Sequence, residues 1–400
     1  MPALSARVAR TELAATFAMA ARARALKAAG HDIISLSLGE PDFATPPHVI
    51  EAAYEAAKRG ETKYPPLSGT NALKAAVREK YRKDQNLDYK PENILITNGG
   101  KQAIFNIVMA VIEDGDEVII PAPAWAGYEQ TVNFAGATPV FAPCHAAQNF
   151  ILQPETLETA ITARTKLLIL NYPNNPTGAA IDAPALQNLA AVLRRHPEIW
   201  VLSDDIYEKL IFDSRPYVTL AALAPDLADR VITLTGVSKT YAMTGWRIGF
   251  IAGPETIIKA ATLVQATATS GVSSIGQAAA LAALTGPQAF LAGRAAAYQS
   301  RRDLVLDALQ TIPGLVCHQP QGAFYLFPDI SACLNKTTPA GRHLHTDSDF
   351  CAALLEEAHV AAVQGSAFAA KGFIRLSTAT SEPTLCEACR RITQFCASLR

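Results

Sequence analysis

Short apolar runs separated by longer helical segments fill the middle of the chain. The runs Asn93–Thr97, Leu167–Leu170 and Ile199–Leu202 are brief, apolar and bounded by turn residues, which predicts buried strands. Segments of helical length lie between such runs from about Asn93 to Gly253. This alternation predicts an α/β fold with a mostly parallel central sheet and crossover helices.

The pattern changes after Gly253. Two alanine-rich segments, Glu255–Leu284 and Pro287–Leu309, predict long helices. From Gly314 onward a closing helix follows three short predicted strands, which are Ala323–Phe327, Val360–Val363 and Phe373–Leu376. This last part is expected to form a smaller α+β domain.

Composition narrows the class of protein. The chain has 400 residues, a 50% hydrophobic content and a net charge of -1, which is typical of a globular protein with an ample core. It has no basic run for nucleic acid and no apolar stretch of about 18 residues for a membrane. The arginine- and alanine-rich segment Ala18–Ala29 resembles a transit peptide in composition, but an amphipathic helix is the preferred interpretation, and the expected location is the cytoplasm.

The cysteines and histidines suggest no metal site. Seven cysteines, an odd number, fit a reducing compartment better than a disulfide framework. Cys386 and Cys389 have the spacing of a metal-binding pair, but no second pair exists at zinc-site spacing, so packed thiols are expected. His343 and His345 lie in a polar segment that is interpreted as a solvated loop.

The most informative segment is 236–249, in which Lys239 follows Ser238 and precedes Arg247 by eight positions. A lysine between small residues can form an imine with an aldehyde, and a serine and an arginine can hold a phosphate. Pyridoxal 5'-phosphate (PLP) contains both groups. A surface lysine remains the alternative for a Ser-Lys pair taken alone.

Other polar residues follow the predicted strands. Asp204 and Tyr207 come after the strand ending at Leu202, where open α/β sheets place their ligands. A carboxylate can keep the cofactor's pyridine nitrogen protonated, and a phenol can bond its 3'-oxygen. After Leu170, the Asn175-Pro176 bond is a candidate cis peptide in a turn, with a plain trans turn as the alternative.

Three further positions complete the predicted cofactor site. The turn at Gly99, Gly100 and Lys101 joins a strand to a helix N-terminus, which is an arrangement that binds phosphate. The indole of Trp125 can stack on a pyridine ring, although a lone tryptophan is more often a core residue. Arg375 lies in an apolar, strand-like run and can bind a carboxylate with two parallel hydrogen bonds, or pair with an internal acid.

In combination these motifs resemble the class I (fold-type I) PLP-dependent aminotransferases, and within them the bacterial aspartate aminotransferases. The resemblance extends from about Leu36 to Arg400. The motifs that carry it are Gly39-Glu40-Pro41-Asp42-Phe43, Lys63-Tyr64, Gly99-Gly100-Lys101-Gln102, Trp125, Asn171-Tyr172-Pro173-Asn174-Asn175-Pro176-Thr177-Gly178, Asp204-Asp205-Ile206-Tyr207, Ser238-Lys239, Arg247 and Arg375-Leu376-Ser377.

The resemblance implies a role for each residue. Lys239 binds the cofactor covalently and acts as the catalytic base, Asp204 pairs with the pyridine nitrogen, and Tyr207 and Asn175 contact the 3'-oxygen. Ser238, Arg247 and the Gly100-Lys101 turn hold the phosphate, and Trp125 stacks on the ring. Arg375 binds the substrate α-carboxylate, assisted by Gly39, Trp125 and Asn175. Tyr64 reaches the active site of the partner subunit in a homodimer.

The resemblance also implies a PLP-transferase fold with a large domain at 44–290 and a small discontinuous domain at 1–43 and 291–400. Ping-pong transfer between an L-amino acid and a 2-oxo acid is expected, with aspartate and 2-oxoglutarate first and aromatic or neutral amino acids as alternatives. A PLP lyase of the same fold is the other candidate. Two departures concern specificity: relatives carry lysine, proline and serine where this chain has Glu12-Leu13-Ala14, and tyrosine where it has Thr378. If Glu12 faces the site, its carboxylate disfavours dicarboxylic substrates.

Overall fold

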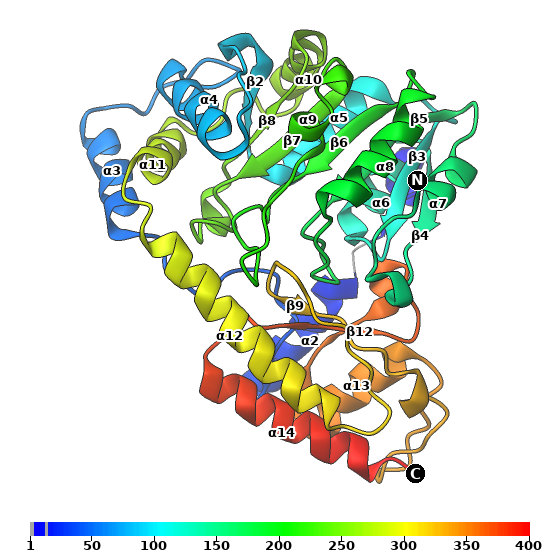
Figure 1. Ribbon diagram of the computed structural model, residues 1–400. Helices are drawn as coiled ribbons and strands as arrows, with labels where there is room; N and C mark the ends of the chain where they lie inside the picture. The colour runs from blue at the N-terminus through cyan, green and yellow to red at the C-terminus, as the bar shows by residue number, and fades with distance from the viewer. Residues whose placement is uncertain (1–3, 13–14) are drawn as a thin grey trace.

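The structure is a computed structural model that describes residues 4–12 and 15–400. Its centre is a seven-stranded sheet (Figure 1). In spatial order the strands are β2 (Ile94–Thr97), β8 (Gly249–Ala252), β7 (Val231–Gly236), β6 (Trp200–Asp204), β5 (Thr165–Asn171), β3 (Glu117–Ala122) and β4 (Thr138–Pro143). Within this sheet only β8 runs antiparallel to its neighbours, β2 and β7. The mostly parallel α/β sheet expected from the sequence is confirmed.

Helices cover both faces of this sheet because successive strand residues point to opposite sides. In β5, Leu167 and Ile169 pack against α5 (Gly100–Val111), α6 (Ala126–Ala135) and α10 (Glu255–Ala268). Leu168 and Leu170 pack into the other core, with the helices α7 (Pro154–Ala160), α8 (Ala183–Arg194) and α9 (Leu220–Leu223). Strands buried on both faces explain the continuous apolar runs of the sequence.

The single helix predicted over 255–284 is wrong. The segment forms two helices, α10 (Glu255–Ala268) and α11 (Ser274–Thr285), separated by a break at 269–273. Ser270 adopts a φ of 60°, which a helix does not tolerate, and the Ser273 hydroxyl caps the new helix by accepting from the Gly276 N–H. The predicted helix after it is confirmed as α12 (Phe290–Gln310).

The C-terminal part forms two small sheets. A three-stranded sheet has the order β11 (Val363–Gln364), β12 (Ile374–Ser377) and β9 (Tyr325–Leu326). In the other sheet, β1 (Ile34–Ser35) pairs parallel with β10 (Val360–Ala361), so the N-terminal segment joins the C-terminal part. The strand predicted over Val360–Val363 is therefore divided between two sheets.

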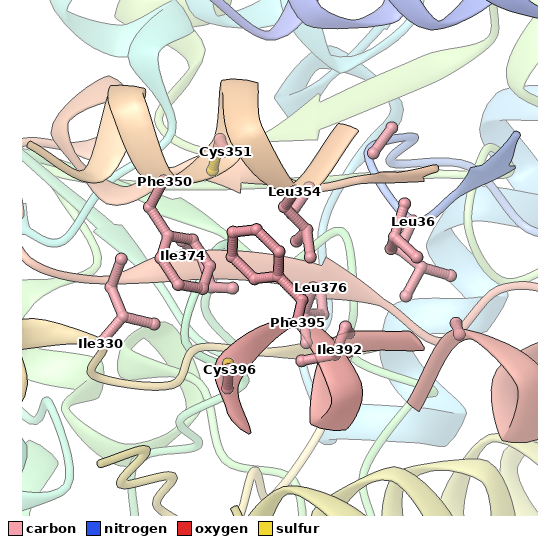
Figure 2. Close-up of a cluster of buried hydrophobic side chains, with 14 of the residues drawn as sticks. Leu36, Ile330, Phe350, Cys351, Leu354, Ile374, Leu376, Ile392, Phe395 and Cys396 are labelled. Atoms are coloured by element: carbon pink, nitrogen blue, oxygen red, sulfur yellow. The ribbon is translucent and has the colours of Figure 1, made fainter. Parts of the chain in front are cut away.

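A separate hydrophobic core supports these small sheets (Figure 2). It joins α2 (Ala15–Ala28), α13 (Asp347–Ala358) and α14 (Glu382–Ser398), and α12 extends from the large sheet to this region (Figure 1). Cys351, Cys389 and Cys396 are buried in this core, and all seven cysteines are free. Among the described residues there is no cluster of metal-ligating side chains and no helix long and apolar enough to cross a membrane.

The remaining α-helices lie toward the N-terminus. They are α1 (Ala6–Ala9), α3 (Pro47–Lys58) and α4 (Asn71–Gln85). Helices α3, α4 and α11 share a core with β2 and β8 that includes Leu73, Val77 and Ile94. This fourth core covers the β2 edge of the sheet, beside the strand end that leads to Gly99.

Candidate active site

The carboxyl ends of β5, β6 and β7 open into a cavity of about 460 Å³, because parallel strands bring their C-terminal ends to one edge of the sheet. The residues that line it come from the large sheet and from the part of the chain that forms the small sheets. Of the residues predicted for the site, those that line the cavity are Gly39, Gly100, Lys101, Trp125, Asn175, Asp204, Tyr207, Ser238, Lys239, Arg247 and Arg375. Tyr64 does not line it and is 96% exposed.

Lys239 lies in the turn after β7 and lines the cavity. Its ammonium group donates to the backbone carbonyl of Gly39. Burial lowers the pKa of Lys239 to about 8, and the positive charges of Arg375 and Arg247 act in the same direction. The uncharged amine, which is both a nucleophile and a base, is therefore accessible close to neutral pH.

Asp204 lies at the end of β6 and is 5% exposed. The Tyr128 hydroxyl donates to its Oδ2 at 2.7 Å, and the Ile206 N–H donates to its Oδ1 at 3.2 Å. Burial raises the pKa of Asp204 to about 6, although both hydrogen bonds and the charge of Lys239 oppose the shift. No lysine or arginine of the described residues forms an ion pair with this carboxylate, so a cationic ligand beside it would stabilise its charged form.

Arg375 is 3% exposed and has no acidic partner among the described residues. Its Nη1 donates to the Asn175 Oδ1 at 2.9 Å, and its Nη2 donates to the Ser37 carbonyl at 2.7 Å. Its Nε has no protein partner in the described chain, and burial lowers the pKa of the guanidinium. The alternative of an internal pair with Asp or Glu is thus wrong, and a buried cation without a counter-charge favours an anionic ligand.

A second basic corner lies where α5 begins. Gly99 has a φ of 78°, and a Cβ atom there would lie 2.6 Å from Nη2 of Arg247. Arg247 donates to the Thr244 carbonyl at 2.8 Å and is itself in the left-handed region, with a φ of 58°. Glycine therefore lets the guanidinium approach the helix N-terminus, and Ser238 adds a hydroxyl to the same cavity. Such a combination suits a phosphate group.

Trp125 is the N-cap residue of α6 and lies at the edge of the cavity. The Lys101 ammonium is 5.4 Å from the centroid of its ring. Burial lowers the pKa of Lys101, and the charge of Arg247 adds to this effect. Lys101 is consequently a further cation on the cavity wall, close to the predicted stacking surface.

The structure also brings to the cavity residues to which the sequence analysis gave no role in the site. Tyr128, Asn171, Tyr325 and Arg24 all line the cavity. Tyr128 is one helical turn after Trp125, and Asn171 is the last residue of β5, so position relative to a predicted strand or helix was the available signal. Tyr325 and Arg24 gave none, because only the tertiary fold places their elements at the sheet edge.

The candidate cis peptide at Asn175-Pro176 is confirmed. The Ala122-Pro123 and Tyr172-Pro173 bonds are cis as well, which the sequence analysis did not predict. Asn171 holds this turn: its Oδ1 accepts from the Asn175 N–H at 3.0 Å, and its Nδ2 donates to the Asp204 carbonyl at 2.9 Å. The turn thereby connects β5 to β6 and presents Asn175 to Arg375.

Glu12 does not face the cavity, so the expected effect of its carboxylate on dicarboxylic substrates has no structural basis. Its side chain is exposed and does not line the cavity, and its backbone carbonyl accepts from Nε2 of Gln130 on α6 at 2.8 Å. Leu13 and Ala14 lie outside the described residues. Thr378 is buried and its hydroxyl has no partner in the described chain.

Comparison with known families decides the class of protein. Residues 31–392 match the family model for aminotransferases of class I and II. The chain belongs to this family. The matched region contains every residue predicted for the site, and of the residues that line the cavity only Ala20 and Arg24 precede it.

Relatives within the family carry more specific names. An aspartate aminotransferase of Rhizobium meliloti (strain 1021) is 51% identical over 379 residues, which cover 95% of this chain and 92% of that protein. An aspartate/prephenate aminotransferase of Cereibacter sphaeroides is 48% identical, with 99% of each chain covered. A solved structure of the Thermus thermophilus aspartate aminotransferase with maleate is 39% identical, has a TM-score of 0.92 and covers 99% of this chain and 100% of that one. The chain is an aminotransferase, and the lyase alternative gains no support.

Proposed function

We propose that this aminotransferase uses PLP to move an amino group between an L-amino acid and a 2-oxo acid. The observation that carries the proposal is the set of unbalanced charges around one cavity. The Asp204 carboxylate has no basic partner there, and Arg375 and Arg247 have no acidic partners among the described residues. A ligand set with a cationic ring nitrogen, a phosphate and a carboxylate would balance all three groups.

The residues fit this cofactor one group at a time. Asp204 would hold the proton on the pyridine nitrogen, since its carboxylate is buried and lacks a cation. Tyr207 and Asn175 would bond the 3'-oxygen, and Trp125 would stack on the ring. The phosphate would lie between Arg247, Ser238 and the Gly100-Lys101 turn, where glycine leaves the room that a Cβ atom would fill.

The chain's own groups then perform the proton transfer. PLP, when bound, supplies an electron-withdrawing ring that stabilises negative charge on the substrate's α-carbon. Arg375 binds the α-carboxylate and fixes the orientation of the amino acid. The Lys239 amine, with its pKa lowered to about 8, removes the proton from the substrate's α-carbon. It then returns the proton to the carbon atom bonded to the other side of the transferred nitrogen.

For the substrate, we propose dicarboxylic amino and oxo acids, with aspartate first. The Rhizobium and Thermus relatives are named aspartate aminotransferases, and the Thermus protein was crystallised with the dicarboxylate maleate. Besides Arg375, Lys239 and Arg247, the cavity wall carries two more cations, Lys101 and Arg24, which are available to a second carboxylate. Aromatic and neutral amino acids remain the second choice.

Half-reactions of the purified PLP form with single amino acids test the function. Aspartate or glutamate should remove the visible absorbance band of bound PLP and yield the matching oxo acid in stoichiometric amount. Both results are expected because the first half of a ping-pong cycle leaves the amino group on the cofactor. Addition of 2-oxoglutarate should restore the band. Release of ammonia without need for an oxo acid would instead indicate a lyase.

Glu12→Lys tests whether residue 12 controls the substrate preference. Because the Glu12 side chain is exposed and outside the cavity, its charge is screened, and the ratio of kcat/KM for aspartate to that for phenylalanine should change by less than about threefold. The ratio is measured at two salt concentrations with Glu12→Gln as the control. A selective gain for aspartate of tenfold or more at low salt would place residue 12 beside the substrate.

We also propose a homodimer. The resemblance assigns Tyr64 to the phosphate of the neighbouring subunit, and the 96% exposure of this side chain in a single chain is consistent with a role outside it. A solution mass of twice the chain mass would support the dimer, and a monomer with full activity would refute it.

The proposed domain division stays at 44–290 for the large domain, with 1–43 and 291–400 in the small one.

A further inference from the structure

Tyr325 lies between the two halves of the site. It belongs to β9, is 1% exposed and lines the cavity. Its hydroxyl oxygen is 2.8 Å from the hydroxyl oxygen of Tyr207, which follows β6 of the large sheet. Its ring lies 4.6 Å from the Arg375 Cζ, and β9 pairs with β12, the strand that carries this arginine. One side chain therefore contacts both the proposed cofactor side and the proposed substrate side.

The contact with Arg375 explains how a buried guanidinium is held without being neutralised. The rings of Tyr325 and Phe368 lie 4.6 and 4.9 Å from its Cζ. Aromatic faces attract a cation but leave its N–H groups free, whereas a carboxylate would occupy them. The arginine thus keeps a fixed position and its capacity for an anionic ligand.

The contact with Tyr207 has a preferred direction. Tyr207 has a single hydroxyl proton, and its proposed role is to donate that proton to the cofactor's 3'-oxygen. Its oxygen must then accept from Tyr325. A hydroxyl that accepts one hydrogen bond becomes a stronger donor in the next, so Tyr325 strengthens the bond that Tyr207 makes.

The backbone preserves this geometry. A Cβ atom at Gly39 would lie 2.8 Å from the Tyr325 hydroxyl oxygen, so a larger residue there would displace the hydroxyl. The same glycine accepts a hydrogen bond from Lys239 through its carbonyl. Glycine at 39 is therefore needed for the Tyr325 hydroxyl as well as for space in the cavity.

We propose that Tyr325 is a positioning residue with two separable actions. Its hydroxyl tunes the Tyr207 bond to the cofactor's 3'-oxygen, and its ring orients Arg375 for the substrate carboxylate. This inference rests on the proposed PLP chemistry of the site. It predicts that the two actions can be removed one at a time.

Two variants separate them. Tyr325→Phe removes the hydroxyl and keeps the ring, so the pH midpoint of the bound cofactor's visible absorbance should rise by about 0.3–1 unit, the effect of one net hydrogen bond on a linked proton. The rise follows because a weaker Tyr207 bond stabilises the deprotonated state less. The Kd of maleate, measured by calorimetry, should stay within about threefold. Tyr325→Leu removes the ring too and should weaken maleate binding by about 3–30-fold.

Tyr298→Phe is the matched control. Tyr298 is also 1% exposed, its hydroxyl donates to Asp42 Oδ1 at 3.2 Å, and it does not line the cavity. It should change neither the midpoint nor the maleate Kd. The inference is overturned if Tyr325→Phe leaves the midpoint at its parental value, if Tyr325→Leu binds maleate as tightly as the parent, or if Tyr298→Phe gives the same shifts. Absence of a visible band in the parent protein would instead refute the proposed cofactor.

Discussion

Lys239→Ala is expected to abolish transamination while leaving the fold intact. The Nζ atom is the only amine next to the Gly39 carbonyl in the described cavity, and its lowered pKa of about 8 suits it to proton transfer near neutral pH. Loss of a general base alone costs about 10²–10⁴-fold in rate. Loss of the covalent bond to the cofactor's aldehyde carbon adds to this, so turnover should fall by at least about 10⁴-fold.

The measurement has two parts. Steady-state turnover with aspartate and 2-oxoglutarate gives the loss in rate, and mass spectrometry after borohydride reduction shows whether the cofactor is attached. The parent should gain the mass of the reduced cofactor on the peptide that contains Lys239, and the variant should not. Lys259→Ala is the control, because that lysine is exposed on α10 and pairs only with Glu255. Normal turnover in Lys239→Ala would falsify the assignment.

Asp204→Asn should lower the rate of proton abstraction by at least about 10²-fold, the size of effect found when one preorganised electrostatic group is removed. The amide has nearly the shape of the carboxylate but carries no charge to hold a proton on the ring nitrogen. Its single amide oxygen can still accept from the Tyr128 hydroxyl but not also from the Ile206 N–H, so the unfolding temperature should fall only by the effect of one lost hydrogen bond. Single-turnover absorbance with deuterated and ordinary aspartate isolates the proton-abstraction step.

Asp205→Asn is the matched control, one residue along the chain. Asp205 is equally buried but faces away from the cavity, where its carboxylate accepts from Ser203 Oγ at 2.7 Å and from Thr219 Oγ1 at 2.9 Å. Burial raises its pKa to about 7, which favours the uncharged form near neutral pH, so an amide should be tolerated. A loss below tenfold in Asp204→Asn, or an equal loss in both variants, would contradict the role given to Asp204.

Much of the fold could be predicted because strands buried on both faces appear in the sequence as continuous apolar runs. The run Ile199–Leu202 placed Asp204 and Tyr207 at a strand end, and the structure brings both to the cavity. Helix ends were harder to predict. The break at Ser270 depends on a left-handed residue and a serine cap, which an alanine-rich composition conceals.

The environment of Arg375 could not be settled from sequence. An arginine in an apolar strand is compatible with an internal acid or with an external anion. The structure decides between them, since β12 brings the guanidinium to Asn175 and the Ser37 carbonyl and to no carboxylate of the described chain. Glu12 is the reverse case, because its sequence position suggested proximity to the substrate and the fold places its side chain outside the cavity.

The sequence by itself determined which chemical groups the site contains and the order in which strands deliver them, because local patterns of apolar and polar residues specify strands and their ends. Only the tertiary structure decided which groups face one another. Tyr128 meets Asp204 across 76 residues of chain, and Tyr325 meets Tyr207 across 118. Contacts at such separations depend on how helices and strands pack, and the burial that this packing produces is the main cause of the pKa shifts of Asp204 and Lys239.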